Sequence, residues 1–143
     1  MINTGGRLDM IKAIFFDFDG VLVDSEKLHS DITIDYLHRT NMPIPDYEAY
    51  GVIGGNPKMN YWESVYERYK NVMPCTYDEL ITGIRDAHKC LKEYDYSKIM
   101  FKDVPETLRT LKDKWYLLAL ASSSAMDYLI KNLNSCGISD IFD

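Results

Sequence analysis

The sequence has few cysteines, no long apolar run and no excess of basic residues, and each of these absences excludes a class of protein. Its three cysteines, at positions 75, 90 and 136, include no Cys-x-x-Cys pair. This argues against a disulfide framework and against a cysteine zinc site. A membrane-spanning helix needs about 20 consecutive apolar residues, whereas the apolar run near the end of the chain covers only residues 116–121.

The charge balance and the first residues exclude further classes. Lys and Arg number 16 and Asp and Glu number 22, so the formal net charge is −6. An acidic protein of this size is poorly suited to bind nucleic acid or an anionic membrane, and we expect neither as a partner. Residues 1–10 lack the apolar core of a secretory signal, so the sequence predicts a cytoplasmic protein.

What is present predicts an α/β fold. Apolar residues make up 46% of the 143 positions, which is typical of a globular chain. Two short apolar runs, residues 11–16 and 115–121, are predicted to be buried strands. The unbroken apolar character of the second run suits a parallel strand that is covered on both faces.

Helical patterns fill the chain between the two strands and after them. Apolar residues recur every three or four positions, and Thr76 and Glu79 form a capping box. Helices are predicted at about residues 26–40, 46–50, 57–73 and 77–91, from residue 105, and ahead of Gly137. This order predicts a core of residues 1–26 and 101–143, interrupted by a helical insertion of residues 27–100.

The strongest chemical signal follows the first predicted strand, where the chain runs DFDGVLVDSE. Asp17 and Asp19 lie two residues apart at the carboxyl end of that strand, which is where open parallel sheets bind ligands. Two carboxylates this close repel each other unless a cation or a shared proton relieves them. Mg²⁺ accepts such oxygen ligands together with substrate phosphate. The alternative is a solvated acidic turn.

Three serines, Ser122, Ser123 and Ser124, follow the second predicted strand at the same edge. Hydroxyl groups beside the N-terminus of a helix form a binding site for an anion such as phosphate. The alternative is that Ser123 or Ser124 only caps the helix. One serine can cap while another binds phosphate, so both interpretations can hold together.

Together these segments resemble the haloacid-dehalogenase (HAD) superfamily. DFDGVLVDSE is similar to the first motif of that superfamily and LALASSS to the second. The helical insertion between them, and the segment VPETLRTLKDK, resemble the branch that contains β-phosphoglucomutase and phosphoglycolate phosphatase. The resemblance extends from about residue 10 to residue 143. It implies a partial HAD-like Rossmannoid parallel sheet with an inserted helical-bundle cap, the C1 cap.

The resemblance also implies an activity, Mg²⁺-dependent phosphoryl transfer from a small phosphorylated metabolite. By motif position, Asp17 resembles the nucleophile that forms an aspartyl-phosphate, and Asp19 resembles the general acid and base. The Asp17 carboxylate and the Asp19 carbonyl would bind Mg²⁺, and Ser122 with the N–H of Ser123 would bind phosphate. Dehalogenases and phosphonatases of the superfamily lack the second acid, so Asp19 favours a phosphatase or phosphomutase.

Three further residues lie in or before the predicted cap. We expect Asp24 to bond backbone amides at the start of the first helix. His29 matches a histidine of some cap-bearing members and is a candidate substrate contact, with a hinge contact as the alternative. Lys58 follows a glycine-containing loop that faces the substrate in the family, and it could meet a second anionic group; the alternative is an exposed lysine.

Two parts of the family pattern have no counterpart in the sequence. No lysine after Ser124 fits the third motif, and the acids of the fourth motif normally follow a segment such as ISDIFD, the last six residues here. The chain therefore resembles the N-terminal part of a longer phosphatase, and we expect this part alone to be inactive. The alternative function is that of a sugar phosphomutase of the β-phosphoglucomutase type.

An interpretation from a different class is a non-catalytic fragment that acts only as a folded or associating module. Two strands without neighbours leave unpaired edges on both sides, and such edges favour self-association.

Overall fold

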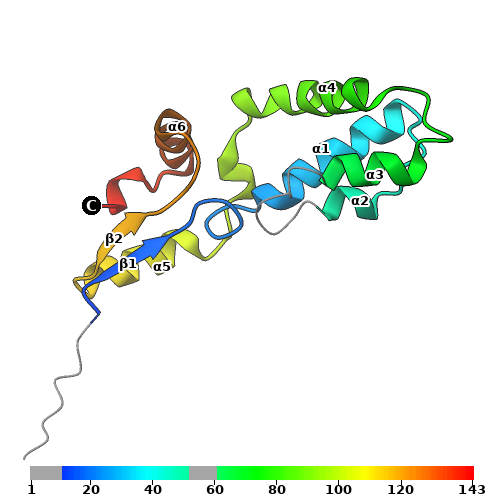
Figure 1. Cartoon of the computed structure of the whole chain (residues 1–143). Coiled ribbons are helices and arrows are strands. Elements are labelled where there is room, and N and C mark those ends of the chain that lie inside the picture. Colours follow the sequence, from blue (N-terminus) through cyan, green and yellow to red (C-terminus); the bar gives the residue numbers. More distant parts are fainter. Residues whose placement is uncertain (1–10, 52–60) are drawn as a thin grey trace, which may run out of the picture. The chain divides into compact units, whose positions relative to one another are not determined.

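The computed structural model describes residues 11–51 and 61–143, which belong to two units. Unit 1 comprises Met1–Val23 and Tyr96–Asp143, and unit 2 comprises Asp24–Asp95. The sequence analysis divided the chain a few residues later at both places. The helices and strands are β1 (Ala13–Phe16), α1 (Ser25–Arg39), α2 (Tyr47–Tyr50), α3 (Tyr61–Tyr69), α4 (Tyr77–Ala87), η1 (His88–Glu93), η2 (Tyr96–Ile99), α5 (Val104–Asp113), β2 (Leu117–Leu120), α6 (Met126–Cys136) and η3 (Ser139–Ile141), where η denotes a 3-10 helix (Figure 1).

Unit 1 is built on a parallel pair of strands, as the sequence predicted. β1 and β2 pair so that Ala13 lies opposite Leu117 and Phe16 opposite Leu120. α5 leads into β2 and packs against it, and α6 follows β2 (Figure 1). The described chain is therefore a mixed α/β structure with a small parallel sheet. Both strands are shorter than the apolar runs that predicted them.

The two faces of this sheet differ in burial. Leu118 is fully buried, whereas Phe15 and Leu117 on the opposite face are 68% and 55% exposed. Successive residues of a strand point to opposite faces, so one face of the sheet is buried and the other is largely exposed. The prediction that the second strand is covered on both faces is therefore wrong for the described residues. Leu117 lies on the face that these residues leave largely open.

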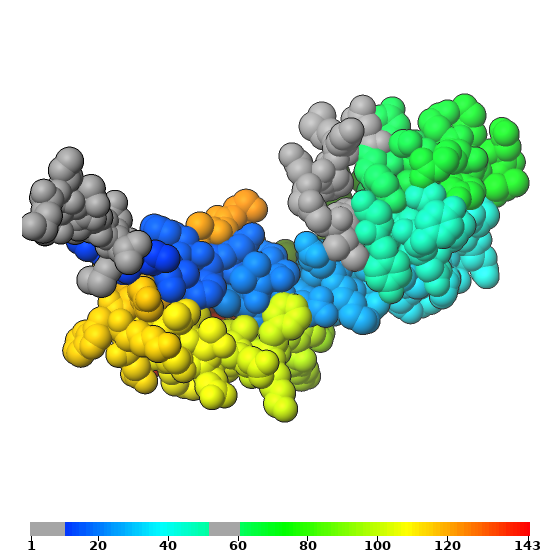
Figure 2. Space-filling view, turned by 90° about the horizontal axis from the view of Figure 1, so that it is seen from below, coloured from blue at the N-terminus to red at the C-terminus, as the bar shows by residue number. Residues whose placement is uncertain are grey.

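Unit 2 consists of helices around an apolar core. Figure 2 shows the surface of α1 and α2, in light blue and cyan, directly against the green surface of α3. The side chains buried together come from three helices and one connection: Leu37, Ile44, Val65, Leu80 and Ile84. Trp62, Tyr66 and Tyr69 of α3 pack against this core, so the aromatic side of this helix is structural.

Two predicted cap signals are present at helix starts. The Thr76 hydroxyl accepts a hydrogen bond from the N–H of Glu79 at 3.3 Å, and the Glu79 carboxylate accepts one from the N–H of Thr76 at 2.8 Å. This reciprocal pair is the capping box at the start of α4. The Asp24 side chain accepts from the N–H of Lys27 at 3.4 Å and so caps α1, in the structural role expected for it.

The segment at residues 95–102 contains a 3-10 helix. Tyr96–Ile99 form η2, which packs against α6 within unit 1, and Tyr96 is fully buried. Burial of a whole tyrosine ring outweighs the polar character of the surrounding segment. Among the described residues, no helix combines the length and the apolar content that crossing a membrane requires.

Candidate active site

The register of the sheet brings two turns to the same edge. We call them the acidic turn, residues 17–23, and the serine turn, residues 122–124. Phe16 and Leu120 pair at the ends of β1 and β2, and the N–H of Ala121 donates to the Phe16 carbonyl oxygen at 2.8 Å. The chain leaves both strands at one end, so Asp17 and Ser122 follow at the same edge. The expected meeting of these two segments is confirmed. The chemical roles of their side chains stay predictions.

The acidic turn is closed by its own backbone. Gly20 has a φ of 71°, a left-handed conformation that glycine adopts without steric cost, and its N–H donates to the Val23 carbonyl oxygen at 2.9 Å. Phe18 is fully buried, whereas Asp19 is half-buried and Asp17 is exposed. The turn therefore buries the ring that lies between the two acids and leaves part of each acid accessible.

The serine turn is held by hydrogen bonds within itself and to the acidic turn. The Ser122 hydroxyl oxygen accepts a hydrogen bond from the N–H of Ser124 at 3.1 Å. The Ser124 hydroxyl donates to Oδ2 of Asp19, also at 3.1 Å. The residue that precedes α6 is Ala125, and no side chain caps the helix there. Neither Ser123 nor Ser124 is thus the N-cap, so that alternative is wrong.

Three aromatic rings form a cluster beneath the acidic turn, and we call them the aromatic cluster: Phe18, Tyr96 and Tyr128. Their ring centroids lie 5.5–6.4 Å apart, and Tyr128 meets the other two edge to face. Burial, the neighbouring Tyr96 hydroxyl and the nearby Asp19 charge raise the pKa of Tyr128. The Tyr128 phenol therefore stays neutral and adds no second negative charge beside Asp19.

Comparison with known proteins places this arrangement in a family. The sequence profile described as "Haloacid dehalogenase-like hydrolase" matches residues 14–143, which is most of the chain. The chain belongs to this HAD-like hydrolase family. The matched residues include the acidic turn, the helices of unit 2 and the serine turn.

Individual relatives agree with this assignment. The chain is 28% identical over 136 residues to pyrophosphatase PpaX of Bacillus velezensis, a match that covers 93% of this chain and 57% of that protein. The fold resembles a HAD family hydrolase from Deinococcus radiodurans with bound phosphate and sodium (TM-score 0.66, 22% identity, 93% of this chain and 56% of that one). It also resembles β-phosphoglucomutase from Clostridium difficile (TM-score 0.60, 23% identity, 94% and 60%). The chain thus spans somewhat more than half the length of these HAD-like proteins.

Two further candidate substrate contacts, Lys58 and His29, come from unit 2. Lys58 lies outside the described residues. His29 lies on α1 in unit 2, where its ring is 5.3 Å from the ring of His88 and its carbonyl oxygen is 3.1 Å from Nε2 of His88. These contacts give His29 a structural partner. Its contact with substrate stays a prediction.

The residues at the sheet edge fit Mg²⁺ in kind, although they are few. Asp17 and Asp19 supply the hard oxygen donors that this ion prefers, and Mg²⁺ commonly binds through one or two carboxylates together with substrate phosphate and water. Within residues 11–51 and 61–143, no group of three or more His, Cys, Asp or Glu side chains is placed to hold a metal ion.

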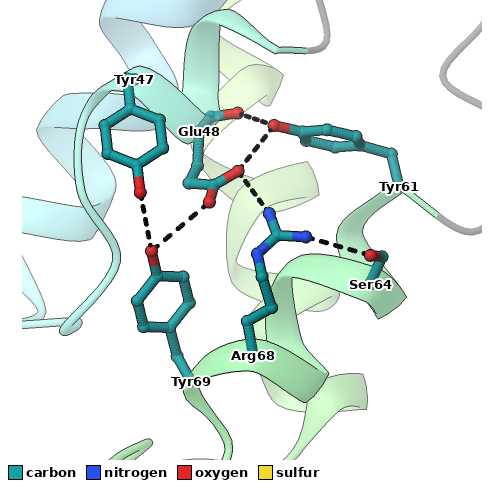
Figure 3. Close-up of polar contacts among 6 residues, drawn as sticks. All are labelled: Tyr47, Glu48, Tyr61, Ser64, Arg68 and Tyr69. Carbon is teal, nitrogen blue, oxygen red and sulfur yellow. Dashed lines mark hydrogen bonds and ion pairs between the residues drawn. The ribbon is translucent and has the colours of Figure 1, made fainter.

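Unit 2 contains a buried carboxylate that the sequence analysis missed, Glu48 on α2 (Figure 3). Its side chain is 6% exposed and accepts hydrogen bonds from Arg68 at 2.6 Å, Tyr61 at 2.9 Å and Tyr69 at 3.4 Å. Burial alone would raise the pKa of Glu48, but these bonds and the Arg68 charge outweigh burial and hold the pKa below its usual 4.5. Glu48 is therefore ionised and fully engaged in structural contacts.

Tyr61 joins this network to the backbone as well. Its hydroxyl lies 2.7 Å from the carbonyl oxygen of Glu48, to which it can also donate. Burial and the Glu48 carboxylate raise the pKa of Tyr61 to about 12, so the phenol stays protonated and remains a donor. No local pattern in the sequence marks this network, because its members lie 13 to 21 residues apart.

Proposed function

We propose that the protein to which this chain belongs is a Mg²⁺-dependent phosphatase that hydrolyses a small phosphomonoester through an aspartyl-phosphate. The observation that supports this most directly is the meeting of Asp17, Asp19 and the serine turn at one sheet edge in a member of the HAD-like hydrolase family. Nucleophile, acid and anion-binding groups must lie this close for phosphoryl transfer to occur.

The first half-reaction transfers the phosphoryl group to the protein. A carboxylate oxygen of Asp17 forms a bond to phosphorus while the bond from phosphorus to the substrate oxygen breaks. Asp19, in its protonated form, gives its proton to the departing alkoxide oxygen. Asp17 is exposed and can meet the substrate directly, whereas Asp19 is half-buried beside the serine turn.

The second half-reaction returns the protein to its starting state. Asp19, now a carboxylate, takes a proton from water as the water oxygen forms a bond to phosphorus. The bond from phosphorus to the Asp17 oxygen breaks, which releases inorganic phosphate. One residue thus acts as acid and then as base, and protons balance over the cycle.

The serine turn would bind the phosphate group of the substrate. Because the Ser122 oxygen accepts from the N–H of Ser124, its own O–H is oriented away from that bond and can donate to a phosphate oxygen. The N–H of Ser123 would add a second donor near the start of α6. Mg²⁺, held by the Asp17 carboxylate and the Asp19 carbonyl oxygen, would offset the negative charge of phosphate and carboxylate when bound.

The test is turnover by the full-length protein and its Asp17→Asn variant. With saturating Mg²⁺, we expect the wild type to release phosphate from p-nitrophenyl phosphate and the variant to lose several orders of magnitude in kcat. Near-normal, Mg²⁺-dependent turnover by Asp17→Asn would disprove the role of Asp17. Inorganic pyrophosphate should be assayed alongside, since a relative with 28% identity is a pyrophosphatase.

A further inference from the structure

The hydrogen bond from Ser124 to Asp19 joins two segments that lie far apart in the sequence and meet at the sheet edge. The Ser124 hydroxyl donates to Oδ2 of Asp19 at 3.1 Å, and both side chains are half-buried. The bond is at the long end of the range for O–H···O contacts. It nevertheless restricts the rotation of the Asp19 side chain, because the acceptor oxygen must keep facing the serine turn.

Ser124 is itself held in place by a hydrogen bond within the serine turn. The N–H of Ser124 donates to the Ser122 hydroxyl oxygen, so backbone and side chain of Ser124 are both engaged. Ser122 and Ser124 therefore differ in what their hydroxyls face. The first is available to an anion, whereas the second is directed at the acid.

The aromatic cluster also holds the acidic turn in place. Phe18, adjacent to Asp19 in sequence, is fully buried and in edge contact with Tyr128 of α6. The backbone of Asp19 is thus held by a packed ring, while its side chain is held by Ser124. Both contacts come from the segment that begins with the serine turn and continues as α6.

We propose that Ser124 is a positioning residue that holds Asp19 in the orientation for proton transfer to the leaving oxygen. The inference rests on the proposed function, because it concerns the acid of that reaction. Ser124 does not touch the reacting atoms in this role. Its contribution depends on how much the leaving group needs a proton.

This dependence gives the proposal a specific test. Glycerol phosphate leaves as an alkoxide and needs the proton, whereas p-nitrophenyl phosphate leaves as a stabilised phenolate and needs it far less. The ratio kcat/KM reports the first half-reaction, in which Asp19 is the acid. In the full-length protein, we expect Ser124→Ala to lower kcat/KM for glycerol phosphate about tenfold, or ~1.4 kcal/mol. For p-nitrophenyl phosphate we expect kcat/KM to change by less than about twofold, because its leaving group needs the proton far less.

Two further variants complete the experiment. Ser124→Thr keeps a hydroxyl at the same position and should restore kcat/KM for glycerol phosphate to near the wild-type value. Ser135→Ala removes a hydroxyl from α6, one that donates to the Asn132 carbonyl oxygen at 3.2 Å, and should leave turnover of both substrates unchanged.

The outcomes separate this proposal from the proposed function. If wild type turns over both substrates and Ser124→Ala loses both equally, or loses affinity alone, then Ser124 contacts substrate or supports the fold and the proposal is overturned. An unchanged Ser124→Ala enzyme overturns it as well. If wild type releases phosphate from neither substrate, the proposed function itself has failed, and this inference fails with it.

Discussion

Replacing Glu48 with glutamine should destabilise unit 2 measurably, although the substitution keeps the size of the side chain. In the wild type, Oε2 of Glu48 accepts from both Arg68 and Tyr61 (Figure 3). A glutamine carbonyl oxygen in the same place keeps both contacts, but as a neutral acceptor. The amide nitrogen then replaces Oε1, so the long hydrogen bond from Tyr69 at 3.4 Å is lost. The perturbation therefore removes the charge and this long contact and leaves the packing intact.

The magnitude follows from the difference between charged and neutral hydrogen bonds. A hydrogen bond to a charged group contributes about 1.5–3 kcal/mol and a neutral one about 0.5–1.5 kcal/mol, so the Tyr61 bond loses ~1 kcal/mol. The Arg68 bond keeps one charged partner and loses less. Solvent screens the pair, since the Arg68 side chain is 47% exposed, and glutamine is easier to bury than glutamate. We therefore expect Glu48→Gln to lower the free energy of unfolding of unit 2 by about 1 kcal/mol.

The assay needs a signal from unit 2 alone. The chain has two tryptophans, Trp62 on α3 in unit 2 and Trp115 in unit 1. In a Trp115→Asn background, urea unfolding followed by tryptophan fluorescence reports on Trp62. Glu67→Gln is the matched control, because Glu67 lies on α3 beside Arg68 and forms an exposed ion pair with Lys70. We expect the control to be indistinguishable from its parent.

The pH dependence provides the decisive result. The pKa of Glu48 is below its usual 4.5 in the folded chain, so the ionised form is favoured by folding. This stabilisation is complete above pH 4.5 and is lost as the pH falls through the folded-state pKa. The difference between wild type and Glu48→Gln should shrink below pH 4.5. A difference that stays constant from pH 7 to pH 3, or a variant as stable as wild type at pH 7, would refute the charge-based argument.

Two other substitutions have predictable signs. Trp115 is 92% exposed with a φ of 66°, so Trp115→Asn should raise the free energy of unfolding by about 0.5–1 kcal/mol, because asparagine tolerates the left-handed region better; a loss of stability in urea unfolding would contradict this. Gly83→Ala in α4 should destabilise unit 2, although alanine is favoured over glycine in helices by about 1 kcal/mol, because its Cβ would overlap the Tyr36 hydroxyl and ring. A Gly83→Ala chain with a higher urea midpoint would show that Tyr36 moves aside at little cost.

The meeting of Asp17 and Ser122 at one edge could be predicted from sequence for a simple geometric reason. Each follows a short apolar strand, and parallel strands bring their carboxyl ends to the same edge of a sheet. The prediction needed only the positions of the two strands and their parallel pairing. Helix starts marked by Asp24 and by Thr76 with Glu79 were predictable for a similar reason, since a cap involves residues within one helical turn.

The contacts that could not be predicted from the sequence join residues that lie far apart along the chain. Ser124 was a candidate cap because caps are local, yet its hydroxyl donates to Asp19, 105 residues earlier. Tyr96 lies in a polar segment, and its burial depends on Phe18 and Tyr128 from two other segments. No periodic pattern encodes such contacts, so only the folded arrangement identifies them.

Glu48 was missed for a further reason. A carboxylate on a four-residue helix ordinarily faces solvent, and nothing in the local pattern marks it as buried. Its burial is tolerated because Arg68, Tyr61 and Tyr69 supply donors from another helix 13 to 21 residues away. This separation along the chain makes the network hard to predict from sequence. It also means that the hydrogen bonds of Glu48 connect two different helices, α2 and α3.

The acids of this chain show how neighbours decide whether a carboxylate supports the fold or remains available for chemistry. Glu48 is surrounded by donors that hold both of its oxygens, and an acid in this state has no capacity left for a substrate. Asp17 is exposed, and Oδ2 of Asp19 accepts a hydrogen bond from the Ser124 hydroxyl. A general acid must be oriented yet still able to exchange its proton, and a neutral donor such as this hydroxyl meets both needs better than an arginine, whose charge would oppose protonation. By this argument, replacing Ser124 with a basic residue would harm proton transfer more than removing its hydroxyl.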